Sequence, residues 1–420
     1  MLTILHTADW HFGAVLYGQR RHREHAAFAE WFIDCVAREK PDVVLISGDI
    51  FDTTTPSHQA QTLYYDTIAA LRRGGCPHII VTGGNHDAPS LINAIQPLVQ
   101  DQGIYIVGAA TENPADEVLL LRDSSGNPQM IVCAVPYLRD RDVRLSESGQ
   151  SPDDKHAALV SGIRHHYEAV TTAACQLRER LAVSVPIIGM GHLFVAGGVA
   201  GDGVRDLYVG TLSYVGTDIF SKDLDYVALG HLHVPQQVSG ATTIRYSGSP
   251  IPMGFGEAKQ QKLVLKVTLE GAGIAPLVTP IHVPTFQRLV AISGDWAKIE
   301  KSVAAICSEL PVPGETAGSD VLVSPIWLDI VYTGSEITSD LRERIDAIID
   351  THPMRVLRVK NQRPVATWES APEISLDDLT PEDVFQRCLE AHHVPESQRG
   401  VLTDVYRETL AGCLATGDAL

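Results

Sequence analysis

Short apolar runs alternate with amphipathic segments over the first part of the chain. The runs Leu2–Thr7, Val43–Ser47 and His78–Thr82 have the length and apolar content of buried strands. Between them, Glu24–Arg38 and Gln59–Arg73 carry apolar residues at helical spacing. This alternation predicts β-α-β units with parallel strands.

The middle of the chain is richer in predicted strands than in helices. Apolar runs bounded by turn residues occur at Met130–Val135, Ile187–Met190, Asp225–Leu229, Thr243–Ser247 and Lys262–Leu269. Early β-α-β alternation followed by such a strand-rich stretch predicts an α/β fold made of two packed sheets with helices outside.

The pattern changes near Pro284, where a second predicted unit begins. It consists of strand Arg288–Ser293, helix Trp296–Leu310, loop Gly314–Asp320, strand Ile326–Tyr332, helix Ser339–Asp350 and strand Met354–Lys360. After Pro372 the chain becomes acidic and helical, with a last helix around Leu402–Leu414. We therefore predict three parts: a main α/β domain over 1–284, a smaller α+β capping domain over 285–370, and C-terminal helices over 371–420.

The composition is that of a globular protein with more than one domain. Its 420 residues are 45% hydrophobic and 20% charged, which supplies enough apolar material for a sizeable core. No stretch approaches the uninterrupted apolar length that crosses a bilayer, and the opening MLTILHTADW lacks a basic leader. We therefore expect a cytoplasmic protein with no membrane segment.

Cysteine and charge counts restrict the kinds of binding site that the chain can form. The seven cysteines are scattered and never form a CxxC pair, which argues against a disulfide framework and a thiolate zinc site. The net charge of −18 argues against holding nucleic acid by lysine and arginine alone. Bound divalent metals, a partner subunit, or the basic segment YGQRRHREH at 17–25 could still supply positive charge. That segment could equally be a solvated loop that enters a helix.

Polar residues able to bind metal follow five of the predicted strands. They are Asp9 and His11 in TADWHFG, Asp49 and Asp52 in SGDIFD, Asn85, His86 and Asp87 in GGNHD, His192 in GMGHLF, and His231 and His233 in LGHLH. Open α/β sheets bind their ligands beyond the carboxyl ends of the strands, so we expect these side chains to converge.

Each motif taken singly has a structural explanation. Asp49 and Asp52 could cap the following helix, and Asn85 could occupy a left-handed turn after two glycines. A histidine beside an apolar run is more often a packing residue than a ligand. Five such coincidences at strand ends are improbable, so the motifs together predict a metal site.

The residue types indicate which metal and which reaction. Carboxylate, imidazole and amide oxygen without thiolate suit manganese, iron or zinc. Two such ions about 3.5 to 4 Å apart would clamp the attacking and leaving oxygens of a phosphoryl displacement. Asp49 is the natural bridging ligand, with Asp9 and His11 on one ion and Asn85 on the other. His86 would act as an acid or a hydrogen-bond donor, oriented by Asp87.

The order DxH, GDxxD, GNHD, GH and GHxH resembles the calcineurin-like metallophosphoesterases. The stretches HTADWHFG, SGDIFDTTTPS, VRDLYVGTLS, YVALGHLH and IRYSGSPIPMGF, with the capping domain and acidic tail, resemble one group more closely: bacterial DNA nuclease subunits that work with an ATPase partner. This resemblance covers nearly all of the chain. It implies a two-sheet sandwich flanked by helices.

The resemblance also implies roles for individual residues. Two manganese ions would be held, the first by Asp9, His11, Asp49 and His233, and the second by Asp49, Asn85, His192 and His231. His86 would be the catalytic histidine. Archaeal and eukaryotic relatives have a histidine where this chain has Asp52, so the resemblance assigns Asp52 no role.

At the level of the whole protein, the resemblance implies an exonuclease on duplex ends and an endonuclease on hairpins, active in DNA repair, replication and recombination. The C-terminal helices would bind the ATPase, and a homodimer would contact DNA through its capping domains. Two alternatives remain open: hydrolysis of a small phosphodiester by the same metals, and a scaffold that has lost catalysis. The capping domain and tail argue against the first, and the complete ligand set argues against the second.

Overall fold

The computed structural model describes residues 1–143, 151–199, 215–238, 243–308, 325–334, 340–350, 352–362 and 380–416. Contacts divide them into two compact units, the larger built around residues 1–291 and the smaller made of described residues within 292–312, 330–348 and 359–420. The predicted loop 314–320 and the VRDLYVGTLS stretch at 204–213 lie outside the described residues. Within the described ranges, no helix combines the length and the apolar character that a membrane crossing requires.

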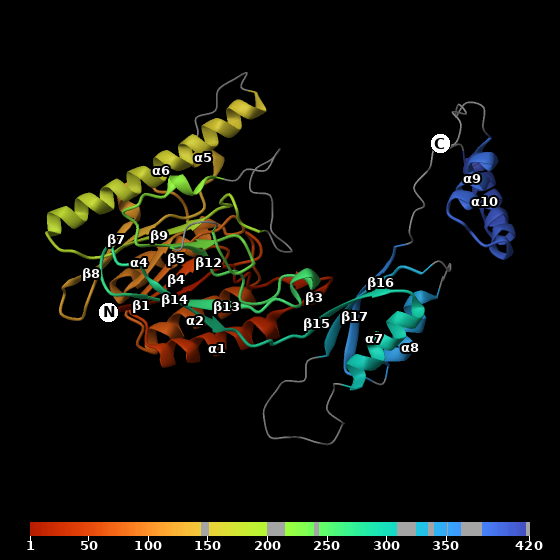
Figure 1. The fold of residues 1–420 in the computed structure, drawn as a ribbon, viewed down its shortest axis with the longest axis horizontal. Helices are drawn as coiled ribbons and strands as arrows, with labels where there is room; N and C mark the ends of the chain where they lie inside the picture. The colour runs from red at the N-terminus through yellow and green to blue at the C-terminus, as the bar shows by residue number, and fades with distance from the viewer. Residues whose placement is uncertain are drawn as a thin grey trace. The chain divides into compact units, whose positions relative to one another are not determined.

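The first sheet of the larger unit has six strands and is parallel at its centre (Figure 1). Its order is β14 (Leu277–His282), β13 (Leu263–Leu269), β1 (Leu2–Thr7), β4 (Val43–Ser47), β5 (His78–Thr82) and β6 (Ile104–Val107). β1, β4, β5 and β6 run parallel, whereas β13 pairs antiparallel with both β1 and β14. The carboxyl ends of β1, β4 and β5 therefore meet at one edge.

The second sheet also has six strands and a parallel centre. Its order is β11 (Gln236–Gln237), β12 (Ile244–Tyr246), β10 (Tyr226–Gly230), β9 (Ile187–His192), β8 (Pro128–Ala134) and β7 (Val118–Arg122). β12, β10, β9 and β8 run parallel, and the outer strands β11 and β7 are antiparallel to their neighbours.

The two sheets pack face to face because successive residues of their strands point to opposite sides. Ile4, Leu45 and Ala228 belong to a fully buried cluster between the sheets. Their neighbours Leu5 and Ile46 face the helices on the outside of the first sheet. Strands buried on both faces read as continuous apolar runs, which is how they stand out in the sequence.

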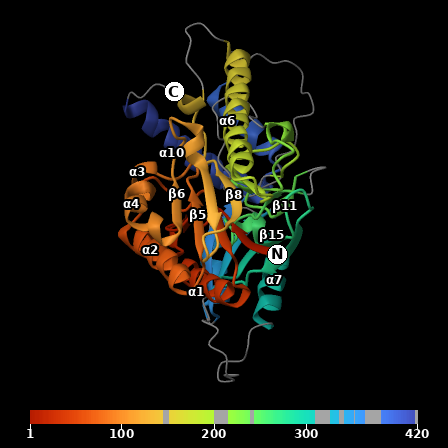
Figure 2. The same cartoon turned by 90° about the vertical axis from the view of Figure 1, so that its left-hand side faces the viewer.

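Helices cover both outer faces of the sandwich (Figures 1 and 2). α1 (His22–Glu39) and α2 (His58–Arg73) pack on the first sheet through residues such as Phe28, Phe32 and Tyr64. The long α6 (Pro152–Leu181) packs on the second sheet through residues such as Ile163 and Val170. The predicted two-sheet sandwich flanked by helices is confirmed.

Shorter elements complete the larger unit. They are the hairpin β2 (Val15–Leu16) and β3 (Gln19–Arg20), and the helices α3 (Pro89–Ile92), α4 (Gln96–Val99) and α5 (Asp140–Val143). Most of the long elements lie within about two residues of the bounds that the sequence predicts, whereas α6, β6, β7 and β14 are not among the predicted elements.

The remaining elements are a three-stranded sheet with two helices and a C-terminal helix pair. The strands are β15 (Leu289–Gly294), β16 (Ile326–Tyr332) and β17 (Met354–Asn361), with β16 central, and the helices are α7 (Trp296–Ser308) and α8 (Leu341–Ile349). Strands and helices alternate here as the sequence predicts.

The C-terminal pair consists of α9 (Pro381–Ala391) and α10 (Glu396–Thr416). Thr380 and Asp383 form a capping box at the start of α9. The rings of Phe385 and Tyr406 stack at a centroid distance of 4.0 Å, and the Tyr406 hydroxyl donates to the carbonyl of Pro381 at 2.9 Å. The two helices therefore pack directly against each other.

Candidate metal centre

The candidate metal ligands converge at the carboxyl ends of strands from both sheets. Asp9 and His11 follow β1, Asp49 follows β4, and Asn85 follows β5. From the other sheet, His192 ends β9, and His231 and His233 follow β10. Each of these side chains is buried except Asn85, which is half-buried.

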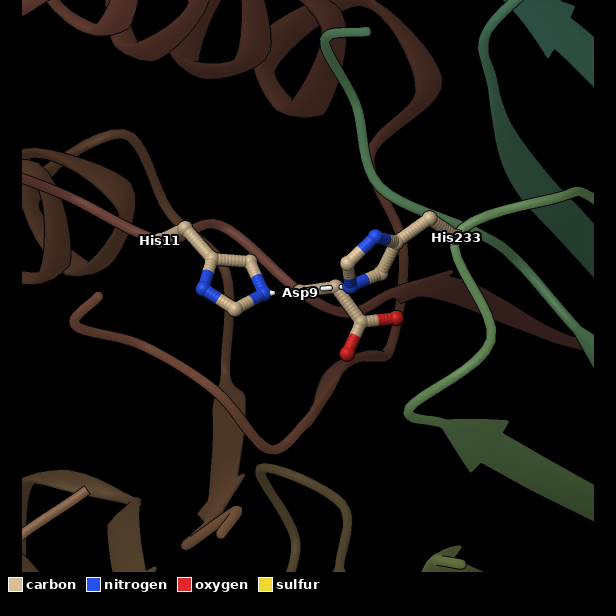
Figure 3. Close-up of side chains that lie close together, drawn as sticks. All are labelled: Asp9, His11 and His233. Carbon is tan, nitrogen blue, oxygen red and sulfur yellow. Dashed lines mark hydrogen bonds between the residues drawn. The ribbon is translucent and has the colours of Figure 1, made fainter. Parts of the chain in front are cut away.

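Among the described residues, three groups of side chains have metal-binding atoms within 4.8 Å of one another. The first is Asp9, His11 and His233 (Figure 3), and the second is Asp49, His192 and His231. The third consists of His11, Asp52 and His86. The structure therefore brings together all seven ligands predicted from the sequence, with Asn85 beside His192.

The first group presents two imidazole nitrogens to each other. His11 Nε2 and His233 Nε2 are 3.2 Å apart (Figure 3). Imidazole nitrogens lie about 2.0 to 2.1 Å from a bound zinc ion, so two of them on one ion lie roughly 3 Å apart. Asp9 Oδ2 is buried, and no donor among the described residues reaches it. A divalent cation fits this set, because it would satisfy all three atoms.

The Asp49 carboxylate lies between the two main groups. Its Oδ1 accepts a hydrogen bond from the backbone N–H of His86 at 2.8 Å. Its Oδ2 is 3.3 Å from His192 Nε2 and 3.7 Å from His11 Nε2. One fixed oxygen and one oxygen facing both groups is the arrangement that a bridging ligand requires.

The His192 ring is oriented by a backbone carbonyl. Its Nδ1 lies 3.0 Å from the carbonyl oxygen of Ser47, to which it can donate a hydrogen bond. Its Nε2 lies 2.9 Å from Asn85 Oδ1. A histidine that donates through one nitrogen presents the lone pair of the other, which is the usual state of a metal-bound imidazole. His192 and Asn85 therefore fit a shared cation.

The structure gives Asp87 a role different from the one expected from its position beside His86. Both Asp87 oxygens accept backbone N–H groups, from Ile50, Phe51 and Gly84 at 2.9 to 3.1 Å. The His86 ring instead places Nδ1 2.6 Å from the carbonyl of Asp52. Adjacent residues in this loop point in different directions, so Asp87 ties the loops after β4 and β5 together and does not orient the His86 ring.

Asp52, to which the family resemblance assigns no role, lies against the first group. Its Oδ1 is 3.4 Å from His11 Nδ1, on the side of the ring opposite His233. Of the two Asp52 groups that touch the site, the backbone carbonyl contacts His86 and the carboxylate contacts His11. The residue therefore orients both rings.

The backbone at the site is strained. Asp9, His11, Asp49 and His231 have φ values of 54°, 47°, 50° and 99°. Side chains larger than glycine rarely adopt this left-handed region, and such outliers cluster at functional sites. The strain directs these side chains into the centre, and the surrounding fold must compensate for its cost.

The buried carboxylates and imidazoles of the centre shift one another's pKa values. Burial raises the pKa of Asp9 to about 7, and the nearby Asp49 carboxylate contributes. Burial alone would lower the pKa of His192, but Asp49 and Asp9 together raise it to about 9. Burial would raise the pKa of Asp49, yet His192 and His11 hold it well below its usual value. The carboxylates thus require nearby positive charge, which a divalent cation would supply.

Comparisons with known proteins agree with this centre. The family model of the calcineurin-like phosphoesterases matches residues 2–235. A second model, described as the type 5 capsule protein repressor C-terminal domain, matches residues 285–393. The SbcD subunit of the nuclease SbcCD from Escherichia coli K12 is 33% identical over 411 residues, which cover 97% of this chain and 98% of the relative. The chain belongs to the SbcD family of calcineurin-like phosphoesterases.

Another relative and one solved structure also show similarity to the chain. The SbcD subunit of the Bacillus subtilis nuclease SbcCD is 35% identical to this chain over 295 residues, 70% of each protein. A dimetal phosphatase from Danio rerio aligns with 67% of this chain and 99% of its own, at 14% identity and a TM-score of 0.36, too low to add to the SbcD assignment. The resemblance predicted from the motifs is confirmed.

Two glycines allow the strands of this SbcD-family chain to approach closely at the centre. A Cβ on Gly230 would lie 1.8 Å from the carbonyl oxygen of Ser47 and 3.0 Å from His192 Nδ1. A Cβ on Gly84 would lie 2.1 Å from Asp49 Oδ1. Gly230 lies against the Ser47 carbonyl that orients His192, and Gly84 lies against Asp49, so only glycine fits at these two positions.

We predict that Gly230→Ala disrupts the centre, because the added methyl group displaces the Ser47 carbonyl that orients His192. Overpacking of this kind typically costs about 1 to 3 kcal/mol of stability. Thermal unfolding should show this loss, and elemental analysis should show less bound metal. Gly271→Ala, where the nearest neighbour is Ile274 Cδ1 at 3.6 Å, serves as the control. Full metal content in Gly230→Ala would contradict this account.

Proposed function

We propose that this chain is a DNA nuclease that hydrolyses phosphodiester bonds with two divalent metal ions. We propose manganese for both ions. The observation that carries the proposal is the position of Asp49 Oδ2, between His192 Nε2 at 3.3 Å and His11 Nε2 at 3.7 Å. A single buried oxygen shared by two sets of ligands favours a pair of ions over a single one.

In this proposal the ligands divide between two ions. Asp9, His11, Asp49 and His233 hold the first, and Asp49, Asn85, His192 and His231 hold the second. Such ions supply an activated water and stabilise the charge that develops on the phosphoryl oxygens. The protein's own contribution is to fix the ligand positions through strained backbone and buried hydrogen bonds.

His86 is the residue we assign to proton transfer or to hydrogen bonding with the reacting phosphate. Its Nδ1 lies against the Asp52 carbonyl, which leaves Nε2 directed toward the centre, 4.0 Å from Asp49 Oδ2. Its side chain is 6% exposed, against 2% or less for the side chains of His11, Asp49 and His192, so it is more accessible to a substrate than they are. That position suits a donor to the leaving oxygen.

The SbcD relatives are named as nuclease subunits, which supports a nucleic acid substrate, and the resemblance of the sequence motifs implies that this substrate is DNA. We propose exonuclease action on duplex ends and endonuclease action on hairpins, in DNA repair, replication and recombination. In the basic segment 17–25, Arg20 and Arg23 are exposed, whereas Arg21 is buried against Glu24. Arg20 and Arg23 are therefore the residues of this segment available to contact phosphates.

We further propose that the chain works with an SbcC-type ATPase, because its relatives are subunits of SbcCD. The helices within 371–420 would bind this partner. Residues 285–370 would form the capping domain, which in a homodimer of the chain would contact DNA. Location in the cytoplasm is part of the same proposal.

The test of this function is a cleavage assay with hairpin and blunt-ended DNA in the presence of manganese. Wild type should cleave both, and His86→Ala should cleave about 10²- to 10⁴-fold more slowly while keeping its metal. His58→Ala, which removes an exposed histidine at the start of α2, is the matched control. Cleavage of only a small generic phosphodiester would identify another hydrolase, and normal cleavage by His86→Ala would remove that residue from the mechanism.

A second prediction concerns the bridging carboxylate. Asp49→Ala should lose metal and all detectable DNA cleavage, because both sets of ligands share this residue. Elemental analysis of the purified protein measures the loss directly. Asp34→Ala, an exposed position on α1, should retain both metal and activity. Normal metal occupancy in Asp49→Ala would show that the bridge is wrongly assigned.

A third prediction concerns the partner. Removal of the residues after Pro372 should abolish copurification with the SbcC-type ATPase and leave manganese content unchanged, because every proposed ligand lies before residue 234. Unchanged copurification of the shortened chain would refute the docking role of the C-terminal helices.

A further inference from the structure

A buried ion pair lies directly behind the proposed ligand His233. Glu257 is fully buried in the short turn Phe255–Glu257, and its Oε2 accepts a hydrogen bond from Lys262 Nζ at 2.6 Å. Lys262, itself 4% exposed, also donates to the carbonyl oxygen of His233 at 3.0 Å and to Ser249 Oγ at 3.1 Å. The pair therefore contacts the backbone of a residue in the metal centre.

The second carboxylate oxygen of Glu257 faces the ring of His233. Glu257 Oε1 is 3.9 Å from His233 Nδ1, and no donor among the described residues forms a hydrogen bond with it. A buried carboxylate oxygen without a donor is costly. A hydrogen bond from the Nδ1–H of His233 would remove that cost.

The facing rings of His11 and His233 indicate how the contact between Glu257 and His233 could assist metal binding. His11 and His233 can bind one ion through Nε2 only if both Nε2 atoms are unprotonated, so that both protons lie on Nδ1. A carboxylate lies beside Nδ1 in each case, Asp52 beside His11 at 3.4 Å and Glu257 beside His233 at 3.9 Å. A carboxylate that accepts a hydrogen bond from Nδ1 selects the tautomer that binds metal and makes the imidazole a stronger ligand.

We propose that Glu257, held by Lys262, is a positioning residue that fixes the ring and tautomer of His233 for metal binding. The inference rests on the proposed two-metal function and deepens it. The ion pair serves two ends: Lys262 compensates the buried charge of Glu257, and its contact with the His233 carbonyl holds the ligand's backbone. Glu257 acts on the metal through His233 and touches neither metal nor substrate.

The experiment is a manganese titration of the full chain purified without metal, with free Mn²⁺ followed by electron paramagnetic resonance. Wild type should bind two ions per chain. Glu257→Gln keeps the shape of the side chain but removes its charge, and we expect it to weaken one of the two sites by about 10- to 100-fold. Affinity equal to that of wild type would overturn the proposal, even if wild type cleaves DNA as proposed above.

A matched control separates positioning from loss of stability. Glu24 forms a comparable buried ion pair, with both oxygens bonded to Arg21 at 2.8 and 2.9 Å, and it contacts none of the proposed ligands. Glu24→Gln should lower the unfolding temperature and bind both manganese ions normally. Equal weakening of manganese binding in Glu24→Gln would show that destabilisation alone explains the effect.

A second pair of variants covers the case in which Glu257→Gln does not fold because Lys262 is left unpaired. Lys262→Met keeps the carboxylate, and Glu257→Gln with Lys262→Met removes both charges of the pair. The double variant should bind manganese more weakly than Lys262→Met. Equal affinity of the two would overturn the role of Glu257. If wild type binds fewer than two ions, the proposed function fails together with this inference.

Discussion

Neutralisation of buried charge is the constraint on which the centre depends. Asp9 and Asp49 lie in the interior with 1% exposure or less, where isolated carboxylates are very unfavourable. Neighbouring imidazoles compensate these carboxylates, which in turn raise the pKa of His192 to about 9. The fold therefore concentrates negative charge at a point where histidines alone compensate it incompletely. Such a centre is stabilised by whatever cation it binds.

The two-sheet sandwich can concentrate negative charge in this way because the proposed ligands are distributed over two rigid sheets. The proposed ligands follow or end β1, β4 and β5 in one sheet, and β9 and β10 in the other. Cores between the sheets and under the helices fix the strands, so the ligands are positioned before any ion arrives. Strain at residues such as Asp9 and His231 persists only because the packing around them determines their conformation.

Much of this could be predicted from sequence because the strands are buried on both faces. Their apolar runs predict bounds close to those observed, and the motifs after them contain the seven proposed ligands that the structure brings together. The helix α6 could also be predicted from the sequence, since Leu159, Ile163 and Val170 repeat at helical spacing. Asp87 was misjudged because proximity in sequence does not give the direction of a side chain. Glu257 could not be found, since only the tertiary fold brings it behind His233.

The paired helices α9 and α10 have a thermodynamic consequence for any association that involves them. A capping box begins α9, and the stacked rings of Phe385 and Tyr406 join it to α10. A segment that is already ordered loses little conformational entropy when it meets another protein, whereas a segment that folds on binding must supply that entropy from contact energy. More of the contact energy is then retained as affinity, and a small interface is sufficient.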